Sequence, residues 1–382
     1  MSTPKPTFPI HPSSGRGRPA NALFFPAAAL YAVFALPLSI QAMLSGTPLL
    51  PGLASPLGHA HEMLFGFAVA VVAGFLITQS TPPRLYALFA LWLSARVGFV
   101  FWPGGWLSMA ANVLFAAGLV AETAPRFMRA AKKLRNQVFG PLLIVIGGLI
   151  ALFSLAGPLG AAASRQAVVE AGVVVFAALL AFMGGRVIAP AVAGHVQRRG
   201  GSLEARVQPR LEAAMLVLLL AAAAAVLAGL PSLGGAALLL AGAVVAVRFV
   251  RWKPGLWLDR VDLRALAVGY AWLGAGLVLM GASGLLASPA LSRVALHAVT
   301  VGALGTLTLT VMARTRVQRA RQDPARIQGL QPAVLLLSAA TVLRLLAPFL
   351  TPWLQALLLS ASLAWSLAFL LLFRLLLMVP AR

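Results

Sequence analysis

Residues 213–230 read AAMLVLLLAAAAAVLAGL, a stretch without a single charged side chain. A helix of that length rises about 27 Å, which is close to the hydrocarbon thickness of a bilayer. Similar Leu- and Ala-rich stretches recur along the chain, and the composition is 60% hydrophobic and only 10% charged. Soluble domains carry roughly 25% charged residues, so this composition is typical of a membrane protein.

The apolar stretches predict an all-α, polytopic membrane helical bundle of 12 transmembrane helices, because they are too long and continuous for barrel strands. Residues 1–20 are expected to form a polar tail without the apolar core of a cleavable signal peptide, and residues 21–382 a single transmembrane domain. The expected spans are 22–45, 60–78, 85–102, 106–123, 138–157, 167–184, 211–230, 232–250, 264–286, 291–313, 332–350 and 353–379.

Basic residues set the predicted orientation. Lys and Arg outnumber Asp and Glu by 30 to 8, and they cluster in alternate loops, at 126–135, 186–210, 251–264 and 314–326. The positive-inside rule therefore places these loops and both termini in the cytoplasm. The longest of the loops, at about 185–210, would allow a division into six plus six spans. Because the basic residues lie in short loops without interleaved aromatics, the expected partner is membrane lipid and not nucleic acid.

The absence of cysteine excludes several kinds of site. Disulfides, cysteine-ligated iron–sulfur clusters and haem attached through thioether bonds all require cysteine. There is also no Gly-rich phosphate loop followed by Lys-Ser or Lys-Thr, so ATP hydrolysis is not expected. Any redox metal must use His, Met or carboxylate ligands.

Three of the five histidines fall within or at the edge of predicted spans. His59 and His61 begin the second span at its outer end, and His297 lies about two turns into the tenth. Imidazole is a common metal and haem ligand, and its placement in lipid favours a function. At about 100° per residue, His59 shares a helix face with Glu62, whereas His61 points away. The pattern predicts metal or cofactor binding without deciding which of His59 and His61 ligates; a hydrogen-bonded structural role for His297 is the alternative.

Charged residues accompany these histidines on the same side of the membrane. Arg96, Arg293 and Arg344 lie toward the outer ends of their spans, where they are expected to meet a cofactor, pair with Glu62 or Glu170, or reach the lipid headgroups. The small residues Gly66, Ala70 and Gly74 follow at intervals of four, which favours close helix packing. His11 and His195 are expected to be solvated.

Two blocks of the sequence carry a family resemblance. Residues 59–68 (HAHEMLFGFA) with 73–78 (AGFLIT), and residues 296–306 (LHAVTVGALGT) with Val311, Met312 and Arg314, resemble the signature of the NnrS family. Residues 183–188 and 269–273 are further matches, and the resemblance covers about 20–380. It implies a twelve-span, multi-pass protein of the bacterial inner membrane that holds haem and copper and takes part in denitrification, nitric oxide metabolism and the response to nitrosative stress.

The resemblance also suggests roles for the candidate residues. A b-type haem would be held by His297 with His59 or His61 as axial ligands, and nitric oxide could bind its iron. Arg96, Arg293 or Arg344 would meet the propionates, Glu62 would orient an imidazole, and Met63 is a further candidate ligand for copper. The chain departs from the family pattern at 79–83. It also has Ala267 and Arg319 where the family has histidines, so a copper site that used those two would be incomplete.

Two other functional classes fit twelve spans. A secondary transporter without haem would be expected to keep its ionisable groups near the midplane, whereas here they gather toward the outer side. A nitric oxide-reducing redox enzyme with a binuclear centre would need more histidines than this chain has. The sequence identifies no electron donor.

Overall fold

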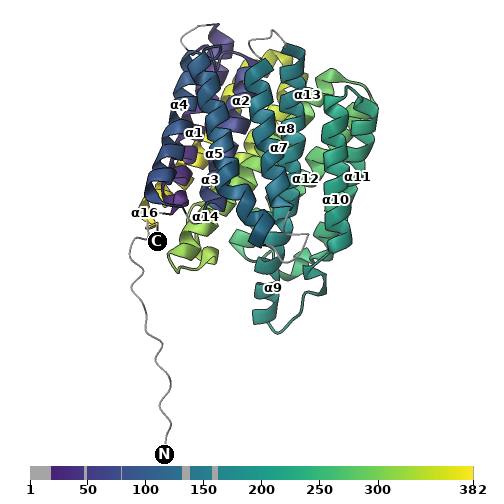
Figure 1. Cartoon of the computed structure of the whole chain (residues 1–382). Helices are drawn as coiled ribbons and strands as arrows, with labels where there is room; N and C mark the ends of the chain where they lie inside the picture. Colours follow the sequence, from purple (N-terminus) through teal and green to yellow (C-terminus); the bar gives the residue numbers. More distant parts are fainter. Residues whose placement is uncertain (1–18, 47–49, 79, 131–137, 157–161, 382) are drawn as a thin grey trace, which may run out of the picture.

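A computed structural model describes residues 19–46, 50–78, 80–130, 138–156 and 162–381 (Figure 1). Within these ranges twelve helical spans are long and apolar enough to cross a membrane, and no strand is found. The all-α, twelve-span prediction is therefore confirmed. The tail with His11 lies outside the described residues.

Nine spans are each built on one long α-helix, in four of them with a short 3₁₀ turn at one end, and three are runs of consecutive α- and π-helical segments. The single helices are α1 (Ala20–Ser45), α4 (Pro82–Phe101), α5 (Trp106–Ala130), α7 (Phe139–Ala156), α10 (Pro209–Leu227), α11 (Pro231–Arg251), α12 (Val261–Leu285), α15 (Leu330–Leu346) and α16 (Leu354–Met378). The runs are α2 (Pro56–His61), η1 (Glu62–Ala68) and α3 (Val69–Leu76); α8 (Ala162–Met183), η2 (Gly184–Ile188) and α9 (Ala189–Arg198); and α13 (Pro289–His297), η5 (Ala298–Gly305) and α14 (Thr306–Arg319).

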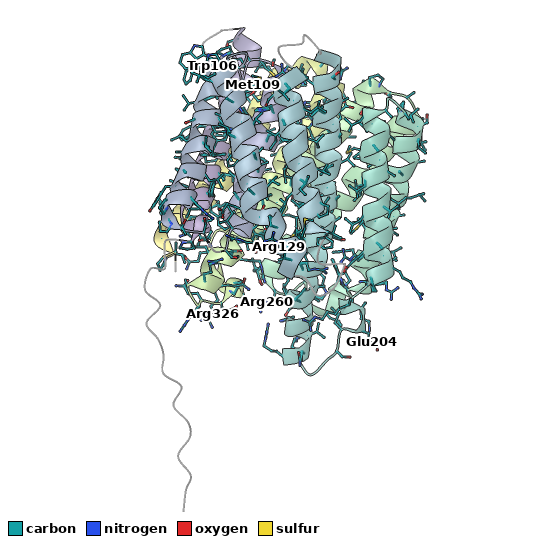
Figure 2. The ribbon with its side chains drawn as sticks, viewed as in Figure 1. Trp106, Met109, Arg129, Glu204, Arg260 and Arg326 are labelled. Carbon is teal, nitrogen blue, oxygen red and sulfur yellow. The ribbon has the colours of Figure 1, made fainter. Side chains whose placement is uncertain are left out.

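The two ends of the bundle differ in composition. Figure 2 shows Arg129, Arg260 and Arg326 at one end, hereafter the basic end, and Trp106 with Met109 at the other, hereafter the aromatic end. Trp106 is 70% exposed there, as expected for a tryptophan at a membrane interface. The basic end is the one that the positive-inside rule predicts to face the cytoplasm.

Arg316 joins the two ends of the described chain. Its guanidinium donates to the backbone carbonyl of Asn21 at 3.1 Å and to that of Val379 at 3.4 Å. Helices α1 and α16 therefore begin and end side by side at the basic end. Along their length, Trp365 donates to the carbonyl of Ala32 at 3.1 Å, and Ser366 donates to that of Val33 at 2.8 Å.

Three spans form the centre of the bundle. The spans Pro56–Leu76, Ser164–Arg198 and Pro289–Arg319 are the most buried. In each of them, 72% to 83% of an apolar 18-residue stretch is buried, whereas the share in the other nine spans is 33% to 61%. These central spans are the second, sixth and tenth, so a buried span recurs every fourth span. The six-plus-six division that the sequence allowed stays a prediction.

Each central span contains one wide π-helical segment. These segments are η1, η2 and η5, and they begin directly after His61, Met183 and His297. A π turn holds about one more residue than an α turn. The side chains before the turn are therefore rotated about the helix axis relative to those after it. Such turns are frequent at functional sites, and here two of the three follow a histidine.

The segment at about 185–210, expected as a loop, is helical in its first part, because the sixth span continues as helix to Arg198. The pair Gly184-Gly185 and Pro190 are ordinary signals for the end of a helix. Here the π turn η2 accommodates them, since its wider spacing relieves the backbone around a proline that lacks an N–H. His195 is consequently not solvated in a loop: it lies on α9, is 9% exposed, and its Nε2 is 3.4 Å from Asp259 Oδ1.

The small-residue ridge of the second span packs closely, as predicted. A Cβ on Gly74 would lie 2.6 Å from the ring of Phe25 on α1, and one on Gly66 would lie 2.5 Å from Nη1 of Arg96 on α4. The ridge therefore lets α1 and α4 approach the backbone of the span that bears His59 and His61.

Candidate functional site

The entry into the second span fixes the two neighbouring histidines. Ser55 accepts a hydrogen bond from the backbone N–H of Gly58 at 3.0 Å, and Pro56 occupies the first turn of α2, so the helix begins with a side-chain cap. His59 and His61 follow within two turns. Because they are two residues apart on a helix, they face different parts of the bundle.

His59 and His297 line one cavity toward the aromatic end, hereafter the histidine pocket. The free volume of the cavity is about 100 Å³. It lies between the central spans, with walls from α1 and α16 as well. Its lining is otherwise mostly apolar: Leu36, Ala60, Met63, Leu64, Phe67, Val169, Val173, Leu296, Thr300, Val301, Leu304 and Trp365.

The hydrogen bonding of His297 determines which ring nitrogen is free. Its Nδ1 lies 2.8 Å from the backbone carbonyl of Arg293, and because a carbonyl can only accept, Nδ1 is the donor. In the neutral ring, Nε2 then carries a lone pair. A backbone carbonyl behind Nδ1 is a usual arrangement for an imidazole that binds a metal through Nε2.

His59 has no such partner. Its Nδ1 is buried and makes no hydrogen bond with any described residue. A buried polar atom without a partner is costly, and in native proteins such an atom points to a missing ligand or water. The two imidazoles of the histidine pocket therefore both have nitrogen lone pairs available for a bound group.

Arg344 is the cation that accompanies this pair. It lies within electrostatic range of both His59 and His297, and it has no hydrogen bond or ion pair with the residues that the structure describes. Its charge is therefore available for an anionic group at the pocket. Arg293 is instead exposed, and it contributes its backbone carbonyl to His297.

His61, Glu62 and Arg96 form a separate cluster, hereafter the Glu62 network. Glu62 is fully buried and accepts hydrogen bonds from Nδ1 of His61 at 2.9 Å, from Nη1 of Arg96 at 2.5 Å and from the hydroxyl of Tyr31. Arg96 also donates to Oδ1 of Asn112 at 2.5 Å. Of the three roles that the sequence allowed for Arg96, the structure shows the ion pair with Glu62.

Aromatic rings enclose the imidazole of His61. It stacks on Phe99 with ring centroids 3.9 Å apart and on Phe153 at 4.6 Å, and it makes a T-shaped contact with Phe65 at a centroid distance of 5.7 Å. The residue is 0% exposed and is not among those that line the histidine pocket. His61 thus belongs with Glu62, and the structure brings only His59 and His297 together.

A second buried ionic cluster lies toward the basic end and was not anticipated from the sequence. Glu212 pairs with Arg248 at 2.8 Å and with Arg186 at 3.4 Å, and Arg248 also donates to the carbonyl of Ala181 at 2.8 Å. Tyr270 lies 3.4 Å from the same guanidinium. The sequence indicates Arg186 only as part of a basic cluster, and no local pattern places Glu212 between Arg186 and Arg248.

The donor atoms at the histidine pocket are two imidazoles and the Met63 thioether. Among the described residues, no three side chains of the His, Cys, Asp and Glu types gather as a metal site. Glu170 does not line the histidine pocket; it accepts a hydrogen bond from Gln166 at 2.7 Å. The geometry suits a group held by two histidines, with a cation nearby and apolar walls.

The sequence profile of the family described as NnrS protein matches residues 22–380, nearly the whole chain. No curated protein matches the chain.

Proposed function

Because the chain belongs to the NnrS family, we propose that it is an integral membrane haem-binding protein of nitric oxide metabolism and the nitrosative stress response. The observation that carries the proposal is the convergence of His59 and His297, from two different central spans, on one mostly apolar cavity. The proposed cofactor is a b-type haem, held toward the aromatic end. The proposed location is the inner membrane of a bacterium, with that end outward.

The residues around the cavity suit this group. His297 keeps Nε2 free because its Nδ1 donates to the Arg293 carbonyl, and His59 has a buried nitrogen without a partner among the described residues. Arg344 supplies a positive charge for a propionate, and the apolar lining suits a macrocycle. When bound, the haem would supply an iron centre that binds nitric oxide.

The Glu62 network has a positioning role in this proposal. It fastens the start of η1 to α1, α4 and α5 through Tyr31, Arg96 and Asn112. His59 lies one turn before that anchor and faces the cavity. His61, Glu62 and Arg96 would therefore hold the helix, and with it His59, in place without touching the cofactor.

Copper is the second group that the family suggests. Two imidazoles and the thioether of Met63 are suitable ligands for copper, especially in the reduced state. They line the same cavity as the proposed haem site, so the two groups would be alternative occupants of it. Metal analysis of the purified protein distinguishes them.

An absorption spectrum of the detergent-purified protein tests the proposal. Spectra are recorded of the oxidised protein, of the reduced protein, and of the reduced protein with nitric oxide. The wild type is expected to show a Soret band, sharp α and β bands after reduction, and a shift of these bands when nitric oxide is added. Pyridine haemochrome gives the stoichiometry, and His297→Ala is expected to remove the bands. A colourless preparation made with ample haem would overturn the proposal and favour a secondary transporter, whereas steady consumption of nitric oxide with an electron donor would indicate a reducing enzyme.

A further inference from the structure

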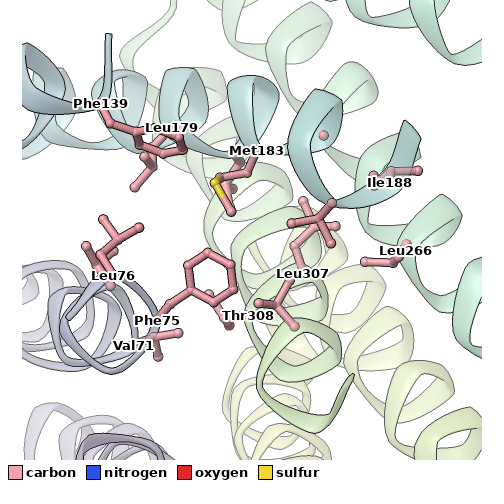
Figure 3. Close-up of a pocket in the computed structure, with 15 residues that line it drawn as sticks. Val71, Phe75, Leu76, Phe139, Leu179, Met183, Ile188, Leu266, Leu307 and Thr308 are labelled. Atoms are coloured by element: carbon pink, nitrogen blue, oxygen red, sulfur yellow. The ribbon is translucent and has the colours of Figure 1, made fainter. Parts of the chain in front are cut away.

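A second cavity lies between the same three central spans, nearer the basic end, and is called the inner cavity below. Its free volume is about 70 Å³, enough for one small gas molecule (Figure 3). Figure 3 shows the side chains of Phe75, Met183 and Leu307 directed toward this space from the second, sixth and tenth spans. Phe139 of α7 and Leu266 of α12 complete the wall.

The inner cavity offers no free polar group from the residues that line it. Its lining is apolar except for Thr308, whose hydroxyl donates to the carbonyl of Leu304 at 2.6 Å and is also 3.1 Å from that of Gly305. That hydroxyl is therefore occupied within its own helix. Apolar cavities of this kind exclude water and take up xenon or small hydrocarbons.

The inner cavity and the histidine pocket follow one another along the bundle axis. Phe67 lines the histidine pocket and Val71, four residues later, lines the inner cavity; Leu304 and Thr308 have the same relation in the tenth span. Four residues of helix rise about 6 Å, so roughly one layer of side chains separates the two spaces. Changes of side-chain rotamer are fast enough to open such a layer transiently.

The wall of the inner cavity also reaches toward the surface of the bundle. Leu266 and Ile188 are fully buried, whereas Phe75, Val187 and Val311 are half-buried. The cavity is therefore only partly enclosed by the residues that line it. Small apolar gases dissolve better in hydrocarbon than in water, so the bilayer would be their source.

We propose that the inner cavity holds a small apolar gas taken from the bilayer and passes it along the bundle axis to the histidine pocket. The identification of that gas as nitric oxide rests on the proposed function. Binding of the gas in the inner cavity depends only on the apolar wall of that cavity and not on any cofactor.

Xenon tests the first half of the proposal. Cryo-electron microscopy or crystallography of the full chain under xenon is expected to show xenon in the inner cavity of the wild type. Val71→Phe, which fills the space, is expected to exclude it, and Leu307→Ala, which enlarges the space, to retain it. Val217→Phe is the matched control, because Val217 is 67% exposed on α10 and its enlargement leaves the cavity unchanged. Absence of xenon from the wild-type cavity, or an acyl chain in its place, would overturn the proposal.

The rate of nitric oxide binding to the haem-loaded protein tests the second half. Val71→Phe is expected to slow binding several-fold while the absorption spectrum stays that of the wild type, and Val217→Phe to bind at the wild-type rate. A wild-type rate in Val71→Phe, with xenon excluded, would overturn delivery through the inner cavity. If the protein proves to hold no haem, the proposed function fails, and the xenon measurement still decides whether the cavity holds gas.

Discussion

His59 and His61 are two residues apart, yet they occupy different surroundings. His59 lines a cavity with His297, whereas His61 is stacked between Phe99 and Phe153 and bonded to Glu62. The angle between neighbouring helical residues predicted that the two would diverge. It did not predict which partner each would meet, because those partners lie on other spans and no local pattern links them.

Glu62 is expected to contribute strongly to stability. Glu62→Gln would leave Arg96 buried beside a neutral amide, and removing one partner of a buried ion pair costs about 3–5 kcal/mol. We expect a marked fall in the thermal unfolding midpoint in detergent. Glu122→Gln is the control, because the partners of Glu122 are exposed, Arg84 by 73% and Arg126 by 42%, and such pairs contribute about 0–1 kcal/mol. Equal stability of the two variants would contradict a structural role for the Glu62 network.

Gly66 allows the same network to approach the helix backbone. In Gly66→Ala the new methyl group would lie 2.5 Å from Arg96 Nη1 and 3.2 Å from Glu62 Oε2, so the ion pair must shift and stability should fall. Gly148→Ala on α7 meets no atom within 4 Å, and alanine favours helix by up to about 1 kcal/mol. Thermal unfolding of both variants checks this contrast, and a Gly66→Ala protein as stable as Gly148→Ala would show that the contact is not restrictive.

The elements that bear the site were only partly predictable. Twelve spans followed from apolar length alone, and most of the expected boundaries lie within a few residues of the observed ones. The π segments could not be predicted from the sequence, because hydropathy does not distinguish a π turn from an α turn. In the sixth span, Gly184, Gly185 and Pro190 indicated an end, yet the wide turn carries the helix past them to Arg198.

The π segment η5 should control the direction of His297. Deleting Ala303 would remove one residue from this segment, restore an α-helical turn and rotate the preceding α13 by about 100° relative to α14. His297 would then leave the histidine pocket. We expect loss of the Soret band while size-exclusion elution and helical content remain those of a folded protein.

Deletion of Gly200 provides the control for this experiment. Gly200 lies in the exposed turn after α9 with a φ of +79°, far along the chain from both histidines, and a methyl group there would meet no atom within 4 Å. Its deletion should keep the haem. Haem retained after deletion of Ala303 would show that the π turn does not direct the histidine.

At the scale of the whole molecule, three buried spans surround the axis and nine others enclose them within the described part of the chain. The sequence predicted the number of spans and, through its basic loops, the orientation. It could not predict that the second, sixth and tenth spans would be central, because their apolar content resembles that of their neighbours. Their burial is a property of the assembled bundle, as is the alignment of the two cavities between them.

The orientation can be measured directly, because the chain has no cysteine of its own. Gly104→Cys lies at the aromatic end, between α4 and α5, and Ser202→Cys lies at the basic end after α9. In intact cells a membrane-impermeant maleimide is expected to label Gly104→Cys and to reach Ser202→Cys only after permeabilisation. The reverse pattern would invert the bundle and place the histidine pocket on the cytoplasmic side.

The haem content of His59→Ala and His61→Ala, purified in parallel, tests most directly the claim that the cofactor is held by His59 and His297. His59→Ala is expected to lose the Soret band while remaining folded, because the residue faces the histidine pocket. His61→Ala is expected to retain haem but unfold at a lower temperature, because it leaves a void between Phe99 and Phe153. A folded His61→Ala protein without haem, beside a His59→Ala protein that keeps it, would contradict this assignment.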